Sequence, residues 1–131
     1  MAMRRILIDT NIYSYALKGD EEVVELLSKV DEIGFSVVSI GELLAGFKGG
    51  TKERKNREEL EEFLDSPRVT VYPVDEETAE FYSDIFARLK RSGTPIPTND
   101  MWIAAIAFQN GLKLYTKDMH FQSIQGLSLV A

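Results

Sequence analysis

Four acidic residues of this chain follow expected strands or begin an expected helix, where their carboxylates can meet. They are Asp9, Glu42, Asp100 and Asp118. Carboxylates gathered in one place repel one another and are destabilising unless cations lie between them. Oxygen-only clusters of this kind are what Mg²⁺ or Mn²⁺ prefer. One or two such ions can activate a water for attack on a phosphodiester. The four acids therefore predict a divalent-metal site for phosphodiester chemistry.

Each of these acids, taken alone, also has a simple structural explanation. Asp9 could cap the helix that follows the first strand, and the sequence Ser39-Ile40-Gly41-Glu42 fits a capping box. Asp100 could complement a helix dipole, and Asp118 could form an ordinary Asx turn. It is the combination of the four positions that favours a metal site over four unrelated structural roles.

The elements that must position these acids alternate along the chain between short β-like runs and longer helical stretches. Strands are expected over residues 6–8, 35–38, 69–72, 112–115 and 128–130, and helices over 11–18, 20–30, 40–47, 51–64, 75–92 and 99–110. This alternation predicts a three-layer α/β/α domain with a mostly parallel central sheet. At about 100–200 residues a domain, residues 1–131 should form a single one.

Parallel strands bring their carboxyl ends to one edge of the sheet, and ligands bind beyond that edge. Asp9 directly follows the first strand, and Asp118 follows the strand over 112–115. Glu42 is expected in the first turn of the helix after the second strand. Asp100 begins a helix that is apolar nearly all round and should be buried against the sheet. The four acids are therefore expected at the same edge.

The composition excludes several other kinds of chemistry. The 131 residues include no Cys and one His, and 15 Lys plus Arg against 21 Asp plus Glu give a net charge of −6. Without Cys there is no disulfide framework, thiolate nucleophile or zinc finger. With His120 as the only imidazole, a Ser-His-Asp hydrolase is hard to build. The acidic balance argues against nucleic-acid binding through bulk charge.

The same composition is that of an ordinary globular protein, and we expect it to be cytoplasmic. No apolar run reaches the ~20 residues that a transmembrane helix needs. The N-terminal residues lack the long apolar segment of a signal peptide. No contact with a membrane is therefore expected.

The segments around the four acids resemble the four motifs of PIN-domain ribonucleases. They are ILIDTN (6–11), SIGEL (39–43), PTNDMWIAA (97–105) and LYTKD (114–118). Within that family the chain is most similar to the VapC toxins of type II toxin–antitoxin systems. The resemblance extends from Ile6 to about Val130, and residues 121–127 resemble the usual end of the family's sequences. The order and spacing of the segments make the set specific.

The resemblance implies an endoribonuclease, dependent on Mg²⁺ or Mn²⁺, that hydrolyses RNA with a metal-activated water. Its catalytic and metal-binding residues would be Asp9, Glu42, Asp100 and Asp118. Thr116 would form a hydrogen bond within the acidic site, and Asn11 and Asn99 would orient carboxylates or water. The resemblance also implies a homodimer that is neutralised by a small cognate antitoxin protein. His120 stands where relatives often carry another Asp, at a position that is usually peripheral.

Two groups of residues have weaker functional interpretations. The basic residues that could contact RNA phosphates are Lys48, Lys52, Arg54, Lys55, Arg57 and Lys117. A solvated helix surface is the alternative interpretation of the first five. His120 is expected to be a turn residue near the surface, and a contact with metal or phosphate is its alternative.

Three other functions are compatible with parts of this pattern. A housekeeping PIN-domain nuclease for RNA processing would use the same chemistry without an antitoxin. A catalytically inert PIN-fold binding module would keep the fold without metal dependence. A haloacid-dehalogenase-like phosphatase needs a second Asp two residues after the first, and Asn11 stands at that place.

Overall fold

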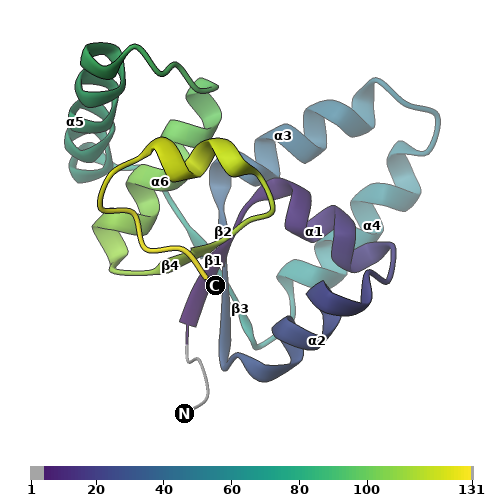
Figure 1. The fold of residues 1–131 in the computed structure, drawn as a ribbon. Coiled ribbons are helices and arrows are strands. Elements are labelled where there is room, and N and C mark those ends of the chain that lie inside the picture. The colour runs from purple at the N-terminus through teal and green to yellow at the C-terminus, as the bar shows by residue number, and fades with distance from the viewer. Residues whose placement is uncertain (1–4, 131) are drawn as a thin grey trace.

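A computed structural model describes residues 5–130, which build a four-stranded central sheet (Figure 1). The strands are β1 (Arg5–Ile8), β2 (Glu32–Ser36), β3 (Val69–Tyr72) and β4 (Lys113–Tyr115). All three strand pairings are parallel, in the order β3-β2-β1-β4, which confirms the expected parallel sheet. Residues 1–4, part of the N-terminal segment for which no signal peptide is expected, and residue 131, the end of the expected domain, lie outside the described part.

The order of the strands reverses at β1. From β1 the chain adds β2 and then β3 on one side, and it returns to place β4 on the other side of β1. Ile8 at the end of β1 pairs with Phe35 of β2 and with Tyr115 of β4. Ligands in open α/β sheets bind outside the carboxyl ends of the strands, at such a reversal. Asp9 and Asp118 therefore follow the two strands that flank the expected binding place.

Helices cover both faces of the sheet (Figure 1). They are α1 (Thr10–Leu17), α2 (Glu21–Lys29), α3 (Val37–Lys48), α4 (Glu53–Leu64), α5 (Glu76–Ser92) and α6 (Thr98–Asn110), with a short 3₁₀ helix, η1 (Met119–Ser123). Side chains alternate along β1, so the sheet has a core on each face. Ile6 and Ile8 pack with α1, α2 and α4 in the first core, and Leu7 packs with α5 and α6 in the second core. The three-layer α/β/α architecture is thereby confirmed.

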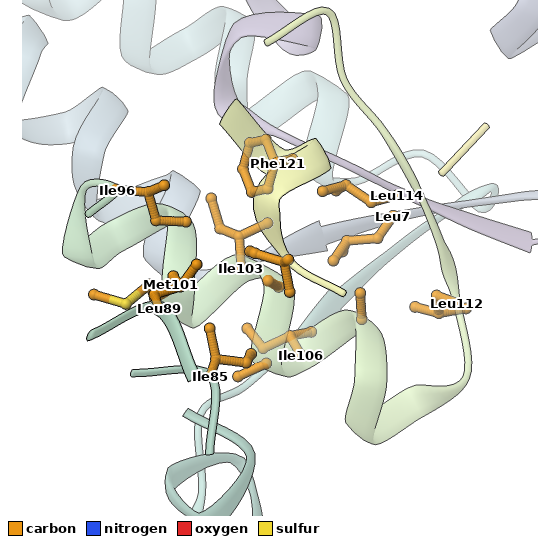
Figure 2. Packing of buried hydrophobic residues seen from close by; sticks show 14 residues of the cluster. Leu7, Ile85, Leu89, Ile96, Met101, Ile103, Ile106, Leu112, Leu114 and Phe121 are labelled. Atoms are coloured by element: carbon orange, nitrogen blue, oxygen red, sulfur yellow. The ribbon is translucent and has the colours of Figure 1, made fainter. Parts of the chain in front are cut away.

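Helix α6 is the centre of the second core, as its apolar sequence predicts. Ile103 and Ile106 are fully buried; Ile103 lies beside Phe121, and Ile106 faces Ile85 of α5 (Figure 2). Phe121 of η1 packs into the same cluster beside Ile103 and Leu114. This core fixes α6, which carries Asp100, against η1, which follows Asp118. Within residues 5–130, no helix combines the length and apolar character needed to cross a membrane.

The boundary between β2 and α3 differs from the expected one. The strand expected over 35–38 ends at Ser36, whose hydroxyl accepts a hydrogen bond from the backbone N–H of Val38 at 2.9 Å. Ser36 therefore caps α3, which begins at Val37. The capping box expected at Ser39 is wrong, and Glu42 lies in the second turn of α3, not the first. Ser39 therefore lies inside α3 and not at its N-cap, so its hydroxyl can form a hydrogen bond with another partner.

The strand expected over residues 128–130 is also wrong. Only one bridge forms there, between Leu114 and Leu129. Leu114 donates to the carbonyl of Ser128 and accepts from the N–H of Val130, both at 2.9 Å. The C-terminal segment thus lies along the outer edge of β4 without adding a full strand.

The first core contains an aromatic cluster with one unsatisfied hydroxyl. Tyr13 of α1 packs on Phe35 and Phe63, with ring centroids 5.6 and 5.0 Å away. Its hydroxyl is buried and has no hydrogen-bond partner among the described residues. Burial, with a further contribution from the charge of Glu59, raises the pKa of Tyr13 to about 12. The hydroxyl therefore contributes desolvation cost without a compensating bond.

We expect Tyr13→Phe to leave stability unchanged or to raise it by up to about 1 kcal/mol, because the variant removes an unpaired buried hydroxyl and keeps the ring. Urea unfolding followed by circular dichroism measures this change. Phe63→Leu is the control, since it removes an aromatic partner and should lower stability. A loss of more than 1 kcal/mol in Tyr13→Phe would contradict the expectation.

Candidate functional site

A pocket opens beyond the carboxyl end of the sheet, at the reversal of strand order. All four predicted acids line it: Asp9, Glu42, Asp100 and Asp118. Asn11 and Asn99 also line it, both with exposed side chains, and so does His120. The structure therefore brings together the four acids that the sequence singled out, and it adds an imidazole to them.

Asp9 is held at the carboxyl end of β1 by two hydrogen bonds. It is 4% exposed and is the N-cap of α1, where its Oδ1 accepts from the backbone N–H of Ile12 at 2.9 Å. The hydroxyl of Thr116 donates to its Oδ2 at 2.5 Å. Burial raises the pKa of Asp9, and this effect outweighs the two hydrogen bonds, which lower it. The charges of Asp100 and Asp118 raise the pKa further. Its capping role and a place in the pocket are thus compatible.

Asp118 and its neighbours form a compact turn after β4. Thr116 Oγ1 accepts from the backbone N–H of Asp118 at 2.9 Å, and Asp118 Oδ1 accepts from the backbone N–H of His120 at 3.2 Å. This is the Asx-type capping that the sequence allowed for Asp118. Thr116 therefore connects both strand ends, because the same hydroxyl donates to Asp9.

His120 lies between two of the acids. Its Nε2 is 2.5 Å from Asp100 Oδ2, and its Nδ1 is 2.7 Å from Asp118 Oδ1. His120 is a partly exposed residue of the turn after β4, as expected, but both of its ring nitrogens also contact carboxylates of the acidic cluster. The ring is brought there by η1, which turns back toward the first turn of α6. The signals in the sequence were its proximity to Asp118 and its place where relatives of the family often carry another Asp.

Glu42 is oriented by the hydroxyl of Thr10, a residue that the sequence did not single out, and Thr10 is in turn bonded to Ser39. Thr10 donates to Glu42 Oε1 at 2.6 Å. The Thr10 hydroxyl also lies 2.8 Å from that of Ser39, which is fully buried. Because a hydroxyl has one proton to donate, Thr10 accepts from Ser39 when it donates to Glu42. The signals were the hydroxyl residue directly after Asp9 and a Ser one helical turn before Glu42.

We expect Thr10→Val to lower stability by about 1–2 kcal/mol, because the near-isosteric change leaves the buried Ser39 hydroxyl without its partner. Urea unfolding with a metal chelator present measures the loss. Thr10→Ser keeps the hydroxyl and should recover most of it. Equal stability of Thr10→Val and wild type would contradict this hydrogen-bonded chain.

The donor set of the pocket fits a divalent cation. Ligand atoms of Asp100, Asp118 and His120 all lie within 4.8 Å of one another. Burial raises the pKa of Asp100, hydrogen bonding and charge from His120 oppose this, and the charges of Glu42 and Asp118 add to it. Carboxylate oxygens that crowd one another in this way are what a hard cation neutralises. The residues present therefore suit Mg²⁺ or Mn²⁺.

The predicted basic residues lie outside the pocket lining. They are Lys48, Lys52, Arg54, Lys55, Arg57 and Lys117. Three of the first five form ion pairs around α4, with N–O distances of 3.5–4.0 Å to Glu53 or Glu58. Lys117 pairs with Asp20 and Glu22, both at 3.5 Å, and its ammonium lies 5.2 Å from the centre of the Tyr15 ring. None of these six side chains lines the pocket that the acids share, although Lys117 directly precedes Asp118 in the chain.

The fold is a three-layer α/β/α domain whose parallel strands lie in the order β3-β2-β1-β4, with an acidic pocket at the end of β1. Together, this fold and this site define a class of α/β domains with an acidic pocket of a type that suits a divalent cation. The sequence model of the PIN domain matches residues 6–127. The chain therefore belongs to the PIN-domain family, and its relatives within it are VapC ribonucleases. The family resemblance seen in the sequence is confirmed.

Curated relatives and solved structures agree with this assignment. Ribonuclease VapC1 of Haemophilus influenzae (strain R2866) is 30% identical over 126 residues, which cover 92% of each chain. Ribonuclease VapC5 of Mycobacterium tuberculosis is 26% identical over 95% of this chain and 90% of that protein.

Two solved toxin–antitoxin structures also match. VapBC-1 from nontypeable Haemophilus influenzae matches with a TM-score of 0.86 and 28% identity, over 98% of this chain and 97% of that one. VapBC2 from Rickettsia felis, bound to a DNA fragment from its promoter, matches with a TM-score of 0.84 and 27% identity, over 98% of both chains. The similarity thus extends over nearly the whole chain.

Proposed function

We propose that this protein is a metal-dependent endoribonuclease, the toxin of a VapBC-type toxin–antitoxin pair, in which residues 1–131 form a single PIN domain. The observation that supports this most strongly is the convergence of Asp9, Glu42, Asp100 and Asp118 on one pocket. Asp9 is buried there with its pKa raised, next to the charges of Asp100 and Asp118. A protein without need of a cation would gain stability by losing such a group.

The four acids would hold Mg²⁺ or Mn²⁺, which supplies activation of water and neutralises charge on the phosphodiester. Asp9 and Glu42 are already oriented by hydroxyl groups, Thr116 on the first and Thr10 on the second. Such outer partners fix the direction of a carboxylate before a ligand arrives. Asn11 and Asn99, exposed at the pocket, are placed to contact water or the sugar–phosphate backbone.

The basic residues around α4 would contact RNA outside the pocket. Lys52 and Lys55 are exposed there, beside the ion-paired Arg54 and Arg57. Their exposed ion pairs contribute little to stability, so exchange of a carboxylate for an RNA phosphate costs little. Lys48 and Lys117 are proposed for the same role.

A cognate antitoxin is the proposed protein partner, with a homodimer as the active form in the cytoplasm. The solved relatives from Haemophilus influenzae and Rickettsia felis are VapBC assemblies and match this chain over nearly its whole length. A housekeeping RNA-processing nuclease is the alternative. A neighbouring reading frame for a short DNA-binding protein, whose product inhibits cleavage, distinguishes the toxin from that alternative.

Cleavage of a structured RNA tests the nuclease activity. The wild type should cut with Mg²⁺ or Mn²⁺ and stop when EDTA is added. Asp100→Asn should cut at least about 100-fold more slowly, as expected for loss of a charged group at the reacting centre. Asp84→Asn is the matched control, because Asp84 is exposed on α5 outside the pocket. If a folded Asp100→Asn cuts as fast as the wild type, the assignment is wrong.

A further inference from the structure

The imidazole of His120 lies between two of the pocket's acids, and metal binding by the four carboxylates alone does not explain its position there. Both ring nitrogens contact carboxylates, at 2.5 Å to Asp100 and 2.7 Å to Asp118. A side chain that only completed the turn after β4 would have no reason to face α6. The inference drawn from this placement rests on the proposed metal-dependent function.

The two contacts of the ring are not equivalent. Asp118 Oδ1 also accepts from the backbone N–H of His120, so it is an acceptor fixed toward this residue. Its partner Nδ1 therefore carries a hydrogen, and Nε2 is the nitrogen that faces Asp100 Oδ2. A hydrogen lies between these two atoms when no ion is bound, because atoms 2.5 Å apart leave no room for a metal between them. Ligand atoms of Asp100, Asp118 and His120 lie within 4.8 Å of one another, so one divalent ion that displaces this hydrogen can bind all three residues.

This arrangement matches a general pattern of metal-binding histidines. A carboxylate that accepts from one ring nitrogen fixes the tautomer and the ring direction, and the other nitrogen binds the metal. Here the ring is also held by its backbone, because the next residue, Phe121, is 1% exposed in the second core. The rings of His120 and Phe121 are 5.2 Å apart. Nε2 is thus positioned before any ion binds.

We propose that Nε2 of His120 is a ligand of the divalent ion, beside Asp100, with Asp118 orienting the ring through Nδ1. The Oδ2 of Asp118 remains available to the ion. A nitrogen donor raises the affinity for Mn²⁺ and its transition-metal neighbours, whereas Mg²⁺ favours an all-oxygen site. His120 therefore sets the metal preference of this pocket toward Mn²⁺.

Spectroscopy of bound Mn²⁺ tests the ligand directly. His120 is the only histidine of the chain, so protein prepared without a histidine tag has a single imidazole. Loss of the free Mn²⁺ signal in electron paramagnetic resonance measures binding. Electron spin echo envelope modulation then detects the ¹⁴N coupling of a coordinated imidazole. We expect that coupling in the wild type and its absence in His120→Asn.

Affinity measurements on the same variants test the metal preference. His120→Asn should bind Mn²⁺ at least about tenfold more weakly, while its affinity for Mg²⁺, measured by competition, changes less than threefold by the same reasoning. His120→Asp should recover binding of both ions without ¹⁴N coupling. Thermal melting in EDTA confirms that each variant is folded.

The outcomes separate this inference from the proposed function. Bound Mn²⁺ without imidazole coupling in the wild type overturns the role of His120 and leaves the acidic metal site standing. Equal losses of Mn²⁺ and Mg²⁺ affinity in His120→Asn overturn the metal preference. A wild type that binds neither ion overturns both the inference and the function. The wild-type spectrum decides the first point even if a variant does not fold.

Discussion

Asp9→Asn is expected to abolish metal-dependent RNA cleavage and to make the metal-free protein more stable. The loss of activity should be at least about 100-fold, because the change removes a charge from the centre that holds the cation. The gain in stability should be about 0.5–2 kcal/mol, the usual range when a functional site is relieved of an unfavourable group. Asparagine keeps the Oδ1 that accepts from the N–H of Ile12, so α1 retains its cap.

Urea unfolding at neutral pH with EDTA measures the gain, and RNA cleavage with Mn²⁺ measures the loss. Asp20→Asn is the control, since Asp20 also caps a helix through a backbone N–H, that of Val23. That hydrogen bond is the main cause of the lowered pKa of Asp20, so its substitution should not stabilise the protein. A destabilised Asp9→Asn that still cleaves RNA would refute the strained-charge interpretation.

The pH dependence of the same two proteins gives an independent check. The pKa of Asp9 is raised above its ordinary value of 3.8, so between 3.8 and the raised value the folded state holds a proton that the unfolded state has lost. Stability in EDTA therefore increases as the pH falls through this window. Over that range the stability of the wild type should increase relative to that of Asp9→Asn as the pH falls. Parallel curves of stability against pH for the two proteins would contradict this expectation.

Phe121→Ala should cost about 3–5 kcal/mol, the usual range for removing a buried aromatic ring. Phe121 is 1% exposed and packs with Leu114 and Ile103 (Figure 2). Its burial also holds η1 in place, and η1 contains His120 and begins after its N-cap Asp118. Loss of the ring should therefore weaken Mn²⁺ binding as well as the fold.

Chemical unfolding in EDTA measures this cost, and titration with Mn²⁺ measures the effect on binding. Met119→Ala is the matched control in the same 3₁₀ helix, because Met119 is 72% exposed and should change stability by no more than about 0.5 kcal/mol. A Phe121→Ala protein within 1 kcal/mol of the wild type would show that η1 is held by other contacts.

The position of the acids could be predicted because it depends on chain order. Asp9 and Asp118 follow strands, and parallel strands end at one edge. The apolar sequence of α6 likewise predicted a buried helix that carries Asp100 to that edge. These features follow from periodicity and topology rules, which local sequence contains.

The hydrogen bonds that orient the acids could not be predicted in the same way. Thr10 and Glu42 are 32 residues apart, and their contact depends on how α1 packs beside α3. The β2–α3 boundary was misplaced because the β-branched Val37 and Val38 favour a strand, whereas the hydroxyl of Ser36 starts a helix. The placement of His120 depended on η1, which has no periodic pattern to read.

The hydrogen bond from Thr116 to Asp9 joins residues 107 positions apart in a chain of 131. During synthesis on the ribosome, Asp9 emerges early, whereas β4, Thr116 and Asp118 emerge only near the end. Contacts of such long sequence separation are intrinsically slow to form. A nascent or truncated chain that ends before β4 therefore carries three of the four acids but lacks Asp118 and the Thr116 hydroxyl that bonds to Asp9, so the complete pocket exists only in a chain that is nearly finished.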